Sequence, residues 1–150
     1  MMGVVATGLW CCLSCSGTPA TSSASAADAV GATNHDLATE HHLWNIAEQA
    51  AHSHAGSIMR AQAVESQHSA AVRLTSGAIV PGNQPVWAIQ IEGLHQFVCR
   101  LCSRPAGVEP PRGRFLTVIV NAKTFETSDG GIGPVAVDLG KLGTVIDLHQ

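Results

Sequence analysis

The chain has little charge and few aromatic residues. Of its 150 residues, 13% are charged and 4% are aromatic, and tyrosine is absent. The net charge is -3 with histidine neutral, and the first Lys or Arg is Arg60. Such a chain lacks the basic surface that binding to a phosphate backbone requires, so we expect no nucleic-acid partner. The low charge also excludes a highly charged disordered tail, and the length predicts one domain.

Common signatures of catalysis are also missing. The sequence contains no Gly-x-Ser-x-Gly elbow for a nucleophilic serine, and the glycines at 130, 131 and 133 match no phosphate-binding loop. A helical zinc pair needs histidines at i and i+4, whereas His41 and His52 lie eleven positions apart. We therefore expect neither an enzyme nor a cofactor.

The first 15 residues form an apolar run without charge. This run is too short to span a bilayer, and with the small residues that follow it is typical of a secretory signal. We predict that residues 1–26 are a signal peptide or a lipoprotein signal. Cleavage after Ala26 would release the chain, whereas acylation of Cys15, in a Leu13-Ser14-Cys15 sequence similar to the end of a lipobox, would anchor it. A buried or disordered N-terminal stretch is the alternative interpretation.

Residues 27–35 are mostly small and offer almost nothing to bury. Such a segment does not offset the entropy lost on ordering, so it predicts a flexible linker. The folded unit is predicted to cover residues 36–150. The protein would then be exported, either extracellular or anchored at the cell surface, with membrane contact only through a lipid on Cys15.

Residues 36–53 predict an amphipathic helix. They contain no Gly or Pro, Asn34 or Asp36 is available as the N-cap, and Gly56 is a plausible stop. Apolar residues recur at spacings of three and four and define one face: Leu43, Trp44, Ile46, Ala47, Ala50 and Ala51.

Alternating apolar residues after this helix predict three or four strands, at residues 71–76, 86–91, 114–122 and 144–148. We expect the Trp87 face to meet the helix and residues 114–122, apolar on both faces, to be central. The stretch between the helix and residue 68 shows no clear pattern, and residues 103–113 and 130–134 predict a loop and a flexible turn. The fold class is therefore α+β, with one N-terminal helix packed on a small antiparallel sheet.

Residues 36 to about 132 resemble the PepSY domains of bacterial exported proteins, and more loosely the cystatin-like helix-on-sheet shape. The matching elements are the helix, the strand around Trp87 to Gly93, and the strand from Leu116 to Thr124. Asn121 and Phe125 replace an acidic residue and a glycine of the usual pattern. The tail after Gly133 is similar to small exported actinobacterial proteins of unknown function. The resemblance implies a role in inhibiting or assisting secreted proteases or in envelope regulation, and it carries over no catalytic residue.

The sharpest motif is Cys99-Arg100-Leu101-Cys102, a C-x-x-C pair. In an exported protein it predicts a disulfide between Cys99 and Cys102. A redox motif would need a helix after the first cysteine, where Pro105 interferes. A zinc site would need more ligands, of which His95 could supply a third. Passive free thiols are the remaining interpretation.

The leading hypothesis is a non-catalytic exported domain that binds a protein or peptide in the cell envelope. An edge strand at residues 72–76 would accept an extended segment, or the loop at 99–113 would make the contact. A second hypothesis is an envelope thiol, disulfide or metal protein that uses Cys99, Cys102 and His95. A third is a structural lipoprotein whose main property is its anchor at Cys15.

Overall fold

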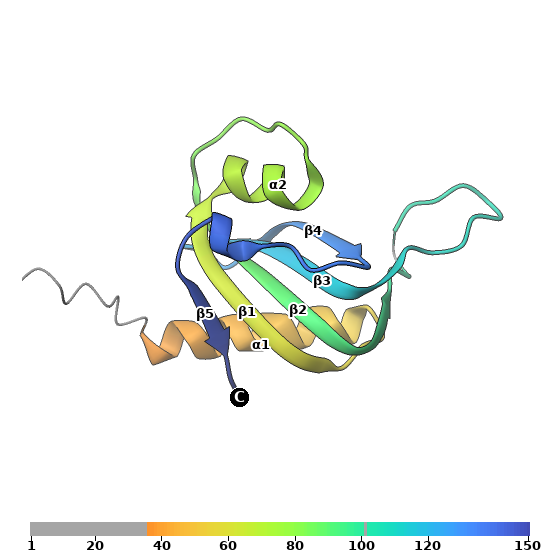
Figure 1. Cartoon of the computed structure of the whole chain (residues 1–150), viewed down its shortest axis with the longest axis horizontal. Helices are drawn as coiled ribbons and strands as arrows, with labels where there is room; N and C mark the ends of the chain where they lie inside the picture. Colours follow the sequence, from red (N-terminus) through yellow and green to blue (C-terminus); the bar gives the residue numbers. More distant parts are fainter. Residues whose placement is uncertain (1–35, 101) are drawn as a thin grey trace, which may run out of the picture. The chain divides into compact units, whose positions relative to one another are not determined.

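The computed structural model describes residues 36–100 and 102–150 (Figure 1). The predicted signal at 1–26, the linker at 27–35 and the lipidation site Cys15 lie outside the described residues. Eight elements follow one another: α1 (Leu37–Ser53), β1 (Ile58–Gln67), α2 (His68–Ser76), β2 (Pro85–Val98), β3 (Arg112–Asn121), β4 (Thr127–Gly133), the 3-10 helix η1 (Leu139–Lys141) and β5 (Val145–Leu148).

The strands form one antiparallel sheet in the order β4-β3-β2-β1-β5. The prediction of an α+β fold with an antiparallel sheet is confirmed, and the described residues add one α-helix and at least one strand to it. The strand predicted at 114–122 is β3, which has a strand on each side as expected, and β2 is the middle strand of the five because β5 returns to pair with β1. The last strand therefore lies at the opposite edge of the sheet from β4.

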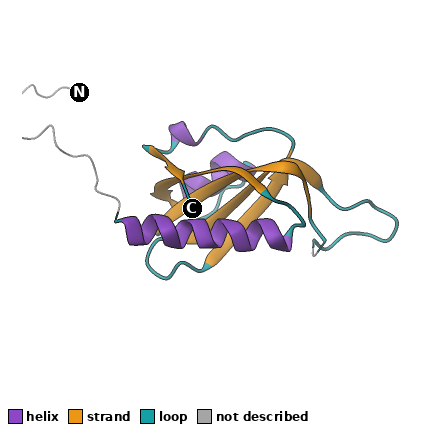
Figure 2. Ribbon diagram, turned by 90° about the horizontal axis from the view of Figure 1, so that it is seen from below, coloured by secondary structure: helices purple, strands orange, loops and turns teal. Residues whose placement is uncertain are grey.

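Helix α1 covers one face of the sheet (Figure 2). Its N-cap is Asp36, whose carboxylate accepts a hydrogen bond from the Ala38 amide at 3.2 Å. Leu43, Ala47 and Ala51 recur every four residues and are buried, which makes one continuous apolar face. This face belongs to the same core cluster as Trp87 of β2, so the predicted contact between the helix and the Trp87 face is confirmed.

Helix α2 packs on the other face of the sheet, against Ile119 of β3. The prediction of a strand at 71–76 is therefore wrong. Ala71 and Val72 are consecutive and both buried, whereas consecutive residues of a strand point to opposite faces of the sheet. The Thr75 hydroxyl donates to the Ala71 carbonyl at 3.0 Å, four residues earlier, as in a helix. Gly77, at φ 73°, then ends the helix in the left-handed conformation.

Two segments without a predicted strand are strands in the structure. Residues 58–67 form β1, which lies between β2 and β5. Residues 130–133, predicted to be a flexible turn, belong to β4. The turn before it is fixed by Asn121, whose side-chain oxygen accepts hydrogen bonds from the Lys123 amide at 2.8 Å and the Thr124 amide at 3.1 Å. This tight turn brings β4 back alongside β3.

An ion pair joins β1 to the last strand. The Arg60 guanidinium lies 2.8 Å from the Asp147 carboxylate, which also accepts a hydrogen bond from Gln62. The hydrogen bond from Arg60 holds the pKa of Asp147 below its usual value, so the carboxylate stays charged at a lower pH than an ordinary aspartate. Separately, within the described residues no helix has the length and apolar content to cross a membrane.

Candidate functional site

Strand β4 is an edge strand with an open outer side. It pairs with β3, and no other strand of the described residues pairs with it. An open edge presents unpaired backbone N–H and C=O groups, which are ready to bind another extended chain. Three of its seven residues are glycines, at 130, 131 and 133, and its sequence contains no Lys or Pro that would block such pairing.

The register of β4 decides which way its residues face. Gly130 lies opposite Val118, and Ile132 lies opposite Leu116. Leu116 and Val118 belong to the core under α1, so Gly130 and Ile132 share that face, whereas Gly131 faces α2. Because glycine carries no side chain, both faces of the edge are left hollow.

The hollow on the α1 side is a groove of about 650 Å³. This volume lies within the range typical of ligand pockets, and such pockets are mostly apolar, as this one is. Its apolar walls come from α1, β3 and β4 and include Ile46, Ala50, Leu116, Val118 and Ile132. The end of the groove where α1 and β2 finish is lined by His54, the two cysteines of the C-x-x-C motif and Pro111.

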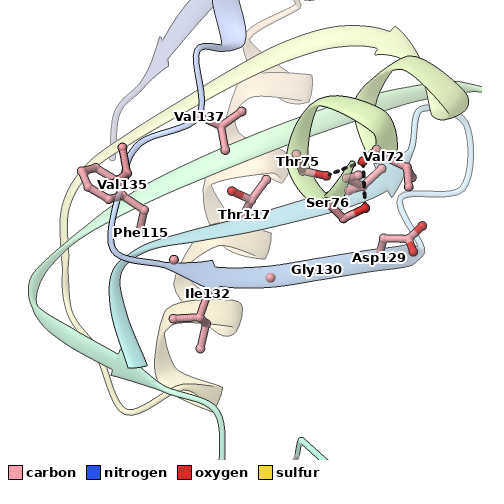
Figure 3. Close-up of a pocket in the computed structure, with 13 residues that line it drawn as sticks. Val72, Thr75, Ser76, Phe115, Thr117, Asp129, Gly130, Ile132, Val135 and Val137 are labelled. Atoms are coloured by element: carbon pink, nitrogen blue, oxygen red, sulfur yellow. Dashed lines mark hydrogen bonds between the residues drawn. The ribbon is translucent and has the colours of Figure 1, made fainter. Parts of the chain in front are cut away.

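The hollow on the α2 side is a smaller cleft of about 180 Å³ (Figure 3). Thr117 lies in it between α2 and the chain at Val135 and Val137, while Ile132 points away from the cleft. The Val137 amide donates to the side-chain oxygen of the buried Gln90 at 2.5 Å, which fixes this wall over the sheet.

An imidazole–carboxylate contact holds the two walls of the smaller cleft together. The Nε2 atom of His68, the first residue of α2, lies 2.8 Å from the Asp129 carboxylate of β4. The Ser128 hydroxyl donates to the Ile119 carbonyl at 3.3 Å, which adds a side-chain bond to the backbone pairing of β4 with β3. The edge strand is therefore held firmly on its inner side while its outer side stays open.

The structure brings Cys99 and Cys102 together as a disulfide, with their Cα atoms 5.5 Å apart. Cys99 is buried and Cys102 is exposed. The Cys99 amide donates to the Pro111 carbonyl at 3.0 Å, and the Val98 amide donates to the His54 carbonyl at 2.9 Å. These bonds tie the pair to the groove. The disulfide thus lies in the wall of the groove, which the sequence analysis did not predict.

The predicted metal ligands His95, Cys99 and Cys102 do not form a metal site in the structure. His95 is an exposed residue of β2, and among the described residues no group of three His, Cys, Asp or Glu side chains is placed to share an ion. The zinc hypothesis therefore gains no support from the geometry.

Sequence reasoning missed the residues that make this site. Gly130 and Gly131 lie in the segment that the sequence predicts to be a turn, because glycine dominates turns, and Asp129 comes directly before that segment. A signal was nevertheless present, since a strong strand followed by the short turn at Asn121 favours a hairpin partner. Comparisons with known proteins do not identify the site either: no family model, curated protein or solved structure matches the chain.

Proposed function

We propose that the protein is a non-catalytic, exported domain, free or tethered to the cell surface, that binds an extended segment of a partner protein. The segment adds to the outer edge of β4 as a further strand. The observation that carries this proposal is the open, glycine-rich edge between two hollows. In strand addition, the main chain supplies affinity and pockets for alternate side chains supply specificity.

The two hollows suit the alternation of a strand. Successive side chains of an added strand point to opposite faces of the sheet. One set would enter the apolar groove beside α1, and the other would enter the smaller cleft beside α2. Large apolar residues are therefore expected at alternate positions of the segment, with small residues between them. The resemblance to PepSY domains is consistent with this proposal, because those domains are associated with regulating secreted proteases.

The variant Gly131→Val tests the proposal directly. A β-carbon at Gly131 meets no other atom within 4 Å, so the side chain is accommodated. Because glycine weakens strands, stability is expected to hold or to rise by about 0.5–1 kcal/mol. The added side chain fills the smaller cleft, so binding to peptides selected from a displayed library is expected to weaken about tenfold, or about 1.4 kcal/mol.

The measurements are chemical unfolding and calorimetric titration of the full chain. Ala78→Val, at an exposed position in the chain after α2, is the matched control and should leave binding unchanged. A library that yields no binder would overturn the proposed function. Equal affinity of Gly131→Val and the unaltered chain would exclude this edge as the site.

Export and anchoring have their own test, the intact mass of the protein recovered from its host. A chain that begins at Cys15 and carries acyl groups is expected for the anchored form, and a chain that begins at Ala27 for the free form. A full-length chain from Met1, recovered from inside the cell, would contradict export.

A second candidate function is thiol–disulfide exchange, which the exposure of Cys102 in the groove wall favours. An exposed sulfur is open to attack by a thiolate. Alkylation of Cys99 and Cys102 only after reduction would indicate a stable disulfide and support the binding domain. Labelling without reduction would place the thiol function first.

A further inference from the structure

The loop between β2 and β3, together with the first residues of β3, concentrates positive charge. Residues 99–114 contain four of the eight Lys and Arg residues of the chain and a single acidic residue, Glu109. Arg114 is paired with Glu92 at 2.9 Å. The other three are exposed, and none of the salt bridges within the described residues involves them: Arg100, Arg104 and Arg112. In a chain of net charge -3, this is a local excess of the opposite sign.

This charge lies at one end of the groove. Arg100 follows Cys99 and Arg112 follows Pro111, and both Cys99 and Pro111 line the groove. The loop projects from the ends of β2 and β3 (Figure 1). At the same end, the His54 imidazole lines the groove, and its buried Nδ1 atom has no hydrogen-bond partner among the described residues.

The opposite end of β4 carries the opposite charge. Strand β4 runs from Thr127 toward Gly133, which pairs with Phe115 near the loop. Glu126 precedes the strand and Asp129 lies in its first half. Two carboxylates, Glu126 and the His68-bound Asp129, therefore lie where β4 begins, with one cation, Lys123, in the turn before them, whereas exposed arginines lie where β4 ends.

We propose that the segment bound at β4 is an apolar strand preceded by acidic residues. This inference rests on the proposed function. Antiparallel pairing is the more stable arrangement, and an antiparallel strand would place its N-terminal end beside Gly133 and the loop. Carboxylates there would meet Arg100 and Arg112, and arginine binds carboxylates in a well-defined planar geometry. Acidic residues after the apolar core would instead lie near Glu126 and Asp129 and be repelled.

The test uses the full chain and three synthetic peptides with one alternating apolar core, measured by calorimetric titration. The first carries a pair of glutamates before the core, the second a pair of lysines there, and the third the glutamates after the core. The first is expected to bind about tenfold more tightly than either of the others, and the difference should shrink as salt is added.

A charge-reversal variant completes the test. Arg100→Glu with Arg112→Glu should abolish or reverse the preference for the first peptide. The matched control, Arg73→Glu with Lys141→Glu, makes the same change in net charge at exposed positions outside the loop and should keep the preference.

The outcomes separate the two proposals. If no peptide binds, the proposed function fails. If all three bind equally, strand addition stands and the acidic preference is wrong. If the chain instead binds vesicles containing anionic lipid, and the loop variant loses this binding, the arginines serve a membrane surface and the inference is overturned.

Discussion

Gly113→Ala is expected to separate β4 from β3 and to lower the free energy of unfolding by about 3 kcal/mol, the upper part of the usual range for overpacking. A β-carbon at Gly113 would overlap the backbone C and O atoms of Gly133. A backbone atom cannot move aside as the end of a flexible side chain can, so the two strands must part. Urea unfolding measures the loss, and hydrogen exchange of the β4 amides locates it.

Gly131→Ala is the matched control, because it changes a glycine of the same hairpin at a position where the added carbon meets nothing. Its stability should equal or exceed that of the unaltered chain. If Gly113→Ala left both the unfolding midpoint and the exchange of β4 unchanged, the close approach of Gly113 to Gly133 would be wrong. Peptide binding should fall in parallel with the protection of β4.

Phe97→Ala is expected to lower the free energy of unfolding by about 3–5 kcal/mol, the typical cost of deleting a buried phenylalanine ring. Phe97 is fully buried, and β-carbons added at Gly56 or Gly93 would crowd its ring. The ring thus fills a space that both glycines leave open, between the end of α1 and the last part of β2. Thermal unfolding followed by circular dichroism measures the effect.

Leu94→Ala is the control for this deletion, since Leu94 is 60% exposed in the same strand and should cost little. Gly56→Ala should be destabilising as well, because the added carbon displaces the Phe97 ring. If Phe97→Ala unfolded at the same midpoint as the unaltered chain, the role of the Phe97 ring in stabilising the fold would be contradicted.

The elements whose local apolar pattern agrees with their final burial could be predicted from the sequence. The sequence predicts helix α1, with Asp36 as a cap, and the strands β3 and β5 to within two residues of their observed bounds, whereas β2 is predicted only over 86–91 and runs on to Val98. Helix α1 has its apolar residues at a helical spacing, and the three strands are rich in β-branched and other apolar residues, so local pattern and burial agree. The pairing of β5 with β1 was not accessible in this way, because it depends on a partner about 80 residues earlier in the chain.

The missed elements have weak or conflicting patterns. Strand β1 buries Ala61, Ala63 and Val64, and alanine gives little signal for a strand. Helix α2 is nine residues long, so the alternation of Val72 and Leu74 imitated a strand. Strand β4 is a strand because its pairing with β3 overrides the poor propensity of its glycines. The candidate site is built from this last strand, which explains why local reasoning did not find it.

The four-residue strand β5 shields the edge of β1 from other chains. A protease cut or a stop codon before Val145 would replace the short edge that β5 forms with the longer, ten-residue edge of β1, on the opposite side of the sheet from β4. Copies of such a fragment could then join head to tail, and a head-to-tail contact that does not close grows into a fibre. Loss of the chain from Val145 onward would thereby give a fragment that polymerises.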